Sequence, residues 1–249
     1  MVAYDFKKGK ARIEEILDKE LKVVELESEE IPADDSLFTF DNAYYGWVSA
    51  VFVDIRNSTS LFVNENKEMM AKIIRCFTSE IIEILREDIN LREIGIRGDC
   101  VYAVYTTPTK DAIYEVADKT FFINTYMKML NELLMSRGLD LIQVGIGMST
   151  SKELVVKAGR KGVGINSKVW IGRAVTKASK YSSIGNKDGN NVIIYSSCSY
   201  INFINKLVDN NKDKKPKDWF TIKYLDNEKL YTANIIQVNF NQWIDDGMK

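Results

Sequence analysis

The stretch that decides the fold is Val48-Ser-Ala-Val-Phe-Val-Asp-Ile-Arg-Asn-Ser-Thr-Ser-Leu61. Its apolar first half predicts a buried strand over residues 48–54 that ends in one carboxylate, Asp54. A carboxylate at the end of a buried strand is costly unless a cation lies beside it. The small polar residues that follow start a helical pattern, and the free N–H groups of a helix start can bind an anion. The stretch therefore fits a site for a metal and a phosphate, and it fits equally well a strand followed by a capped helix.

A second acidic stretch, Ile94-Gly-Ile-Arg-Gly-Asp-Cys-Val-Tyr-Ala103, favours the metal site. Residues 93–105 predict two strands joined at Gly98-Asp99, since glycine permits a tight turn. The predicted order strand, helix, strand, strand, helix, strand is the ferredoxin-like pattern, which places the first strand beside this hairpin. Asp54 and Asp99 should then face each other at one sheet edge. Asp99 alone fits an ordinary turn residue, but two facing carboxylates repel each other, and one or two divalent cations relieve that repulsion.

Composition narrows the possible chemistry. The chain has 249 residues, 45% of them apolar, with a net charge of −1 and no histidine. The charge gives no sign of a nucleic-acid or membrane-surface protein, and the absence of histidine excludes Ser-His-Asp, Cys-His and His-ligated zinc sites. The three cysteines are odd in number and widely spaced, as in reduced cytosolic proteins. With no visible signal peptide and no apolar run of about 20 residues, we expect a cytoplasmic protein.

Apolar spacing predicts the other elements. An amphipathic helix over 5–27 could pack on the main domain or on a partner chain, and an acidic linker follows at 28–35. Further helices are predicted at 61–85, 109–136, 171–181 and 198–207, strands at 139–148, 152–158 and 190–195, a loop at 159–168, and a hairpin over 220–236 with Asp226-Asn227 at its tip.

Four stretches together resemble the motifs of class III nucleotidyl cyclases. They lie in the same order and spacing over residues 45–200, which makes the set specific where one match would be weak. The stretches are Val53-Asp-Ile-Arg-Asn-Ser-Thr59, Ile96-Arg-Gly-Asp-Cys-Val-Tyr-Ala103, Val144-Gly-Ile-Gly-Met148 and Trp170-Ile-Gly-Arg-Ala-Val-Thr-Lys-Ala-Ser-Lys180. The resemblance implies an α+β, ferredoxin-like cyclase domain with a mainly antiparallel sheet. It assigns 1–44 to an N-terminal helix and linker, 45–207 to the catalytic domain, and 208–249 to a C-terminal hairpin packed on that domain.

The resemblance also implies residue roles. Asp54, Asp99 and the carbonyl of Ile55 match the metal ligands, and the late helix places Thr176 where the family has an Asn that orients the ribose. Lys180 stands at the position of a transition-state Arg and lacks that residue's two-point fork. The turn that binds the triphosphate through its N–H groups matches Ile55, Arg56, Asn57, Ser58 and Thr59.

The positions that read the base depart from the purine cyclases. Where those enzymes have a Lys or Glu, this chain has Gly95, and their Asp or Cys partner corresponds to about Val169. Neither residue can read a purine edge by side-chain hydrogen bonds. Arg97 has the reach to pair with a pyrimidine carbonyl, and it could equally hold phosphate or form a structural ion pair.

A narrower similarity covers most of the chain. Val155-Val-Lys-Ala-Gly-Arg-Lys-Gly-Val-Gly-Ile-Asn166, with Val169-Trp-Ile-Gly172, resembles the pyrimidine cyclases of bacterial Pycsar anti-phage systems. This resemblance implies conversion of UTP or CTP to cUMP or cCMP, two divalent cations with Mn²⁺ preferred and Mg²⁺ possible, and a homodimer with shared active sites. The product would activate a separate effector protein. A purine cyclase, an inactive nucleotide-binding module and a structural interaction domain remain as alternatives.

Overall fold

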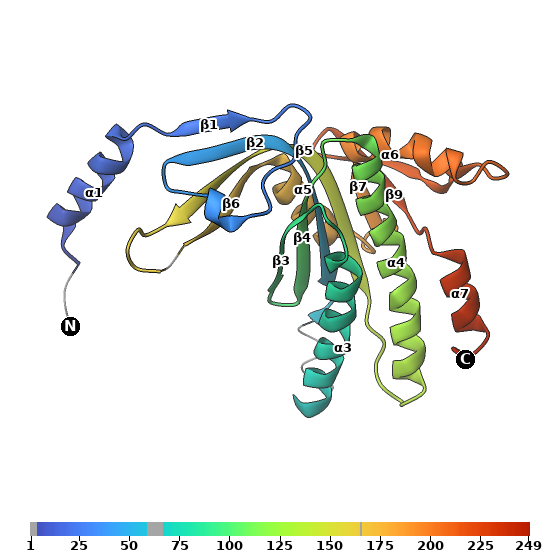
Figure 1. Cartoon of the computed structure of the whole chain (residues 1–249). Helices are drawn as coiled ribbons and strands as arrows, with labels where there is room; N and C mark the ends of the chain where they lie inside the picture. Colours follow the sequence, from blue (N-terminus) through green and yellow to red (C-terminus); the bar gives the residue numbers. More distant parts are fainter. Residues whose placement is uncertain (1–3, 59–66, 165) are drawn as a thin grey trace.

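Strand β2 (Asn42–Ile55) is the centre of the sheet in the computed structural model, which describes residues 4–58, 67–164 and 166–249. It pairs antiparallel with β4 (Cys100–Thr106) on one side and with β5 (Val144–Gly159) on the other. The described strands run in the order β3-β4-β2-β5-β7-β9-β8, with β1 beside β2 and β6 beside β5 (Figure 1). The remaining bounds are β1 (Lys22–Glu25), β3 (Leu91–Arg97), β6 (Asn166–Gly172), β7 (Ile193–Ser196), β8 (Thr221–Leu225) and β9 (Glu228–Ala233).

The order β3-β4-β2-β5 confirms the ferredoxin-like pattern within an α+β fold. Successive side chains of β2 point to opposite faces of the sheet, and each face is covered by its own core. Val51 and Val53 belong to the core formed with α3 (Lys67–Arg86), α4 (Lys110–Met135) and α6 (Ser197–Asp209). Ala50 and Phe52 belong to the core under α5 (Arg173–Ile184) on the opposite face. The ends of the strands are therefore fixed between two packed layers.

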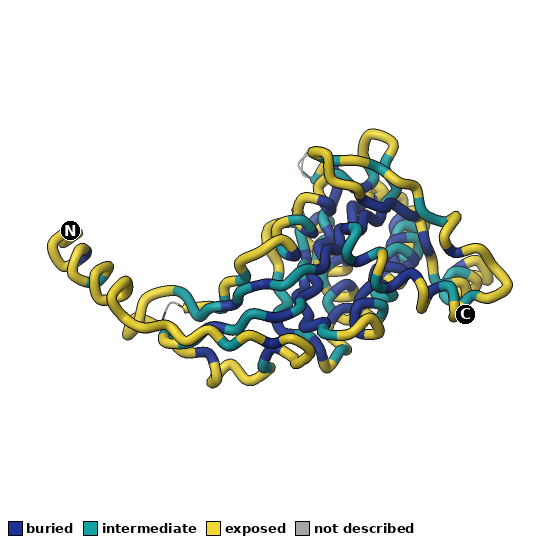
Figure 2. Tube along the Cα trace, turned by 90° about the horizontal axis from the view of Figure 1, so that it is seen from above, coloured by how far each residue is buried: buried dark blue, intermediate teal, exposed yellow. Residues whose placement is uncertain are grey.

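The N-terminal prediction was wrong in its second half. Helix α1 (Phe6–Asp18) ends well before residue 27, and β1 follows it, paired in parallel with the start of β2. The β-branched residues Val23 and Val24 are compatible with a strand, and pairing with β2 decides against the helical pattern that continues from α1. Figure 2 shows α1 as an exposed arm that extends away from the sheet.

The expected linker is anchored instead of loose. Ile31 is fully buried, and the buried Arg92 donates to the carbonyl of Ile31 and pairs with Glu30 at 2.9 Å. A short 3-10 turn, η1 (Asp35–Leu37), then leads into β2. The chain entering β2 is thus held in place by a buried cation.

The two strands predicted at 139–148 and 152–158 are one long strand, β5. The loop predicted at 159–168 is only the tip of a hairpin, because β6 begins at Asn166 and pairs back along β5. Gly162 and Gly164 have φ values of +79° and +75°, which other residues rarely adopt, so they permit this tip. Residues 171 and 172 still belong to β6, so α5 starts at Arg173 and not at 171.

The C-terminal residues extend the main sheet. The predicted hairpin is confirmed as β8 and β9, which turn at Asp226 and Asn227, and β9 pairs with β7. A 3-10 turn, η2 (Pro216–Trp219), precedes the hairpin, and a helix that the sequence did not reveal, α7 (Val238–Asp245), follows it. Segments 1–44 and 208–249 thus each add strands to the same sheet. Among the described residues, no helix has the length and apolar character needed to cross a bilayer.

Candidate active site

Asp54 and Asp99 lie together at the end of β2. Asp54 pairs with Cys100, the residue directly after Asp99 in the β3–β4 turn. The N–H of Ile55 donates to the carbonyl of Asp99 at 3.4 Å. Gly98, with φ +63°, permits the tight turn. The register of two antiparallel strands therefore sets the distance between the two aspartates.

The pKa of the Asp54 carboxyl is raised above its ordinary value. Burial is the main cause, the guanidinium of Arg56 opposes it, and the neighbouring Asp99 raises the pKa further. A partly dehydrated carboxyl beside a second carboxyl is stabilised in its ionised form by a bound cation.

The donor set fits hard divalent cations. Two carboxylates and the carbonyl of Ile55 are all oxygen donors, which suit Mg²⁺ or Mn²⁺. Over residues 4–58, 67–164 and 166–249, no group of three or more His, Cys, Asp or Glu side chains could hold a metal ion. Cations bound at Asp54 and Asp99 would therefore need phosphate oxygens and water to complete their coordination.

Arg56 is bound within the chain in a way that the sequence did not reveal. Its side chain is only 3% exposed, forms an ion pair with Asp54 and donates to the carbonyl of Ser183 near the end of α5. Its N–H donates to the carbonyl of Gln143 at 2.7 Å. In this state neither the side chain nor the backbone N–H of Arg56 is available to bind a triphosphate. Arg56 instead holds Asp54 in place.

Asn57, Ser58 and Thr59 are the other residues of the turn expected to bind the triphosphate, and the structure describes the first two. Asn57 has φ +53°, a left-handed conformation that Asn tolerates. Ser58 is half-buried, and Thr59 lies outside the described residues.

Lys187 is a site residue that sequence reasoning missed. It is exposed in the loop after α5, and its positive charge lowers the pKa of Asp54. The loop reaches this edge because Gly145, the β5 partner of Asp54, lets the backbone of α5 and its following turn come close. A Cβ at Gly145 would lie 2.1 Å from the carbonyl oxygen of Ser182. No sequence signal marks Lys187, because its position depends on this packing.

The late helix packs on β5 through backbone contacts. A Cβ at Gly147 would lie 2.1 Å from the carbonyl oxygen of Ala178, so only glycine lets α5 pack this closely. At the first turn of α5, buried Glu153 accepts a hydrogen bond from the N–H of Ala174 at 2.5 Å and one from Ser151 at 2.8 Å. These contacts fix the orientation of the helix.

Thr176 and Lys180 lie on the exposed side of α5. The Thr176 hydroxyl donates to the carbonyl of Gly172 at 3.0 Å, within its own helical turn. Lys180 forms an ion pair with Asp226 in the β8–β9 turn. Both predicted residues thus face solvent and are engaged with their own chain, whereas Asp54 interacts with Arg56 and Lys187.

An aromatic ring covers Gly95, the position on β3 that the resemblance predicts would read the base. Gly95 pairs across the sheet with Tyr102, and a Cβ at Gly95 would lie 2.8 Å from that ring. The Tyr102 hydroxyl donates to Glu93 at 2.8 Å, and the indole N–H of Trp170 donates to the same carboxylate at 2.8 Å. Arg97, two residues beyond Gly95, is exposed at the end of β3. Sequence reasoning missed Glu93, Tyr102 and Trp170, because only the cross-strand register brings them together.

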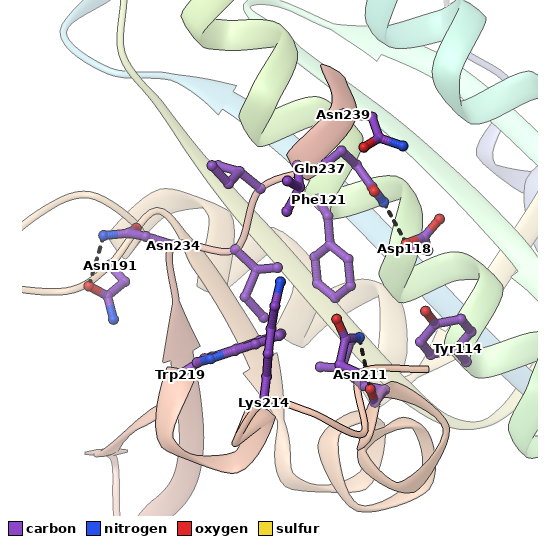
Figure 3. A pocket seen from close by; sticks show the side chains of 14 residues that line it. Tyr114, Asp118, Phe121, Asn191, Asn211, Lys214, Trp219, Asn234, Gln237 and Asn239 are labelled. Atoms are coloured by element: carbon purple, nitrogen blue, oxygen red, sulfur yellow. Dashed lines mark hydrogen bonds between the residues drawn. The ribbon is translucent and has the colours of Figure 1, made fainter. Parts of the chain in front are cut away.

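A separate cavity of about 640 Å³ lies between α4, η2 and the segment that joins β9 to α7 (Figure 3). Asp118 accepts a hydrogen bond from the side chain of Gln237 at 2.7 Å at its wall. None of the predicted site residues lines this cavity.

One protein family and two named relatives match this chain in sequence. A family described as the adenylate and guanylate cyclase catalytic domain matches residues 40–210. The chain belongs to this family. A protein named uridylate cyclase from Treponema porcinum is 53% identical over all of this chain and 83% of its own length. A uridylate cyclase from Gulbenkiania mobilis is 30% identical over 98% of this chain and 97% of its own.

Solved structures agree with this fold. The adenylyl cyclase CyaB of Pseudomonas aeruginosa has a TM-score of 0.60 at 18% identity, over 77% of this chain and 95% of its own. A class III adenylyl cyclase-like ATP-binding protein from the same organism has a TM-score of 0.67 at 15% identity, over 96% of this chain and 48% of its own. The protein is therefore a nucleotidyl cyclase with a class III fold.

Proposed function

We propose that this cyclase acts on UTP and produces 3′,5′-cyclic UMP and pyrophosphate. The observation that carries the proposal is the position of Asp99 beside Asp54 at one sheet edge, set by the pairing of Asp54 with Cys100, in a chain of the cyclase family. The choice of UTP rests on the two relatives named uridylate cyclase. CTP remains the closest competing substrate, because uracil and cytosine share the 2-carbonyl group and differ at one exocyclic group.

The residues around Gly95 favour a pyrimidine over a larger purine base. The Tyr102 ring stands where a side chain from residue 95 would have to pass, and Glu93 and Trp170 fix the Tyr102 hydroxyl. A side chain at residue 95 would have to displace the Tyr102 ring, so a purine cyclase built on this chain would have to read its base through the backbone or Arg97. We assign contact with the pyrimidine carbonyl to Arg97, which is exposed and carries several donors.

The cofactors in this proposal are two divalent cations, with Mn²⁺ preferred and Mg²⁺ possible. Asp54, Asp99 and the carbonyl of Ile55 would hold them. Bound there, they would acidify the ribose 3′-hydroxyl and neutralise charge on the triphosphate.

The protein's own residues position the reactants. The 3′-oxygen attacks the α-phosphorus in line, the bond to the β-phosphate oxygen breaks, and the hydroxyl proton passes to solvent. Thr176 orients the ribose, while Lys180 exchanges Asp226 for the charge that develops on the α-phosphate. Lys187, near Asp54, adds a cation for the leaving pyrophosphate. The turn of Asn57, Ser58 and Thr59 supplies the remaining contacts to phosphate, since the N–H of Ile55 already donates to the carbonyl of Asp99.

The biological setting is part of the proposal. Two copies form a homodimer in which the aspartates of one protomer meet α5 of the other. Residues 45–207 carry the reaction in the cytoplasm, where its substrate is. Cyclic UMP then activates a separate effector protein during phage infection. No direct contact with nucleic acid or membrane is needed.

One assay tests the reaction and its base preference. The purified protein is incubated separately with UTP, CTP, ATP and GTP in the presence of Mn²⁺, and cyclic products are separated by chromatography. Cyclic UMP as the main product is expected, and Asp209→Asn, an exposed acid at the end of α6, serves as the matched variant that stays active. A cyclic purine as the main product would overturn the substrate assignment. Nucleotide binding without any product would instead indicate an inactive binding module.

A further inference from the structure

Helix α1 carries an apolar stripe that the described residues of its own chain leave uncovered. Phe6, Ile13 and Leu17 are spaced seven and four residues apart, so they lie on one side of the helix. Their exposed fractions are 71%, 57% and 76%, and Ile16 beside them is 72% exposed. The helix extends away from the sheet (Figure 2), so the stripe faces solvent along its whole length.

The charges of α1 are divided along its length. The first half carries only cations, and the second half carries only carboxylates. The two sets are Lys7, Lys8, Lys10 and Arg12, and Glu14, Glu15 and Asp18.

This division opposes the helix dipole. The N-terminal end of a helix favours negative charge and the C-terminal end favours positive charge. The caps Asp5 and Lys19 follow this rule, whereas the helix between them has no acid in its first turn and no base in its last. The one (i, i+4) pair across the midpoint, Lys10 with Glu14, has the less favourable Lys-before-Glu order. The charge pattern therefore works against the isolated helix, and a neighbouring charged surface would account for it.

We propose that α1 packs antiparallel against α1 of a second copy of this chain. A two-fold axis perpendicular to the helices brings the basic half of each helix against the acidic half of the other. The same arrangement faces Phe6 of one copy toward Leu17 of the other and covers both apolar stripes. A parallel pair would instead place like charges side by side.

The charge pattern also argues against other occupants. An anionic membrane surface would attract the basic half and repel the acidic half. A 13-residue helix is marginal by itself in water, so the pair requires that the chains be held close, and in this respect it rests on the homodimer proposed above. The ion pair of Lys19 with Asp41 and the pairing of β1 with β2 anchor the base of α1 to the sheet. This inference does not depend on the reaction proposed above.

Disulfide trapping tests the pairing and its direction. In a full-length Cys76→Ser background, which removes the exposed native cysteine, Phe6→Cys and Leu17→Cys chains are made with tags of different size, mixed and oxidised. The 6-to-17 cross-link is expected as the dominant product, and Ala11→Cys, on the opposite side of α1, should cross-link with neither. Cross-links of 6 to 6 and 17 to 17 would overturn the antiparallel arrangement, and the absence of any cross-link would overturn the pairing.

Charge reversal gives an independent test in the same full-length chain. Lys7→Glu, Lys8→Glu and Arg12→Glu make an acidic α1, and Glu15→Lys with Asp18→Lys makes a basic one. Each variant alone should lose the cross-link, and a mixture of the two should restore it, less so at high salt. Equal cross-linking in all samples would contradict the charge argument. Binding to phosphatidylserine–phosphatidylcholine vesicles that Ile13→Asp abolishes would assign the stripe to a membrane and overturn the proposal.

Discussion

The sheet edge that carries Asp54 and Asp99 differs from the side of α5 that carries Thr176 and Lys180. At the sheet edge, strand register and a buried Arg56 hold the carboxylates before any ligand binds. On α5, the helix itself is fixed by backbone packing, but Thr176 and Lys180 point to solvent and bond within their own chain.

In the proposed homodimer, this difference means that only one half of the site is assembled within a single chain. Register and burial are properties of one folded chain, so the aspartates need no partner to take their positions. Lys180 must give up Asp226 before it can contact a substrate. The pair is largely exposed and therefore weak, so the exchange is inexpensive. A site completed by α5 of a second copy would explain why this half is exposed.

Mixing two inactive variants gives the largest expected effect and tests this division. Asp99→Asn and Lys180→Ala should each lower cyclase activity by roughly 10² or more, because each removes charge stabilisation of the reacting phosphate. If the aspartates and α5 act across a dimer, each mixed dimer contains one intact site. An equal mixture should then recover about a quarter of wild-type activity, since about half of the dimers are mixed and each has one of two sites intact.

The control for this experiment is the double variant. Asp99→Asn and Lys180→Ala in the same chain, mixed with wild-type chain, leave each mixed dimer with no intact site. Activity measured as cyclic nucleotide per total protein should then drop to about a quarter of wild type, the share of pure wild-type dimers. No recovery in the first mixture, with dimers present by light scattering, would contradict the shared site.

Sequence reasoning predicted the sheet edge better than α5, for physical reasons. Asp54 follows an apolar run, Asp99 lies in the turn between two strands, and the ferredoxin-like order then places them together without further information. The role of Arg56 was not predictable, because its carbonyl partner, Ser183, is 127 residues away in sequence. Lys187 was missed for a similar reason, since only the packing of Gly145 brings its loop to Asp54.

Element boundaries failed where two patterns overlapped. Residues 22–25 continue the charged, amphipathic pattern of α1, and only pairing with β2 makes them a strand. Residues 166–172 follow a glycine-rich stretch and precede a helix, so pattern alone assigned them to the loop and the helix start. In both cases a tertiary strand partner outweighed the local preference.

Gly147→Ala tests whether the close packing of α5 on β5 contributes to stability and activity. The new Cβ would lie 2.1 Å from the carbonyl oxygen of Ala178, so α5 must move away from β5. We expect a loss of about 1–3 kcal/mol in unfolding free energy, the usual cost of overpacking, and reduced activity. Thermal unfolding and the cyclase assay measure both effects. Gly46→Ala is the matched control, since its Cβ would meet only side-chain atoms of Ile31 and Leu26 at 3.3 Å. Equal losses of stability and activity in the two variants would contradict a special role for the packing of α5.

Glu153→Gln gives the smallest effect and tests whether the anchor of α5 responds to pH. Burial raises the pKa of the Glu153 carboxyl, although the N–H of Ala174 and the hydroxyl of Ser151 partly oppose this. Because the folded state then holds its proton more tightly than the unfolded state, wild-type stability falls as pH rises above the ordinary Glu value of 4.5.

Glutamine does not titrate and keeps an acceptor for Ala174, so the melting temperature of Glu153→Gln should gain on that of wild type as the pH rises above 4.5. Glu228→Gln provides the opposite sign, because the hydrogen bond from Lys177 lowers the pKa of Glu228, and its removal should cost stability at neutral pH and not at acid pH. Melting curves that stay parallel to wild type across this range would show that Glu153 anchors α5 in the same way whether or not it is ionised. The orientation of Thr176 and Lys180 would then depend on glycine packing alone.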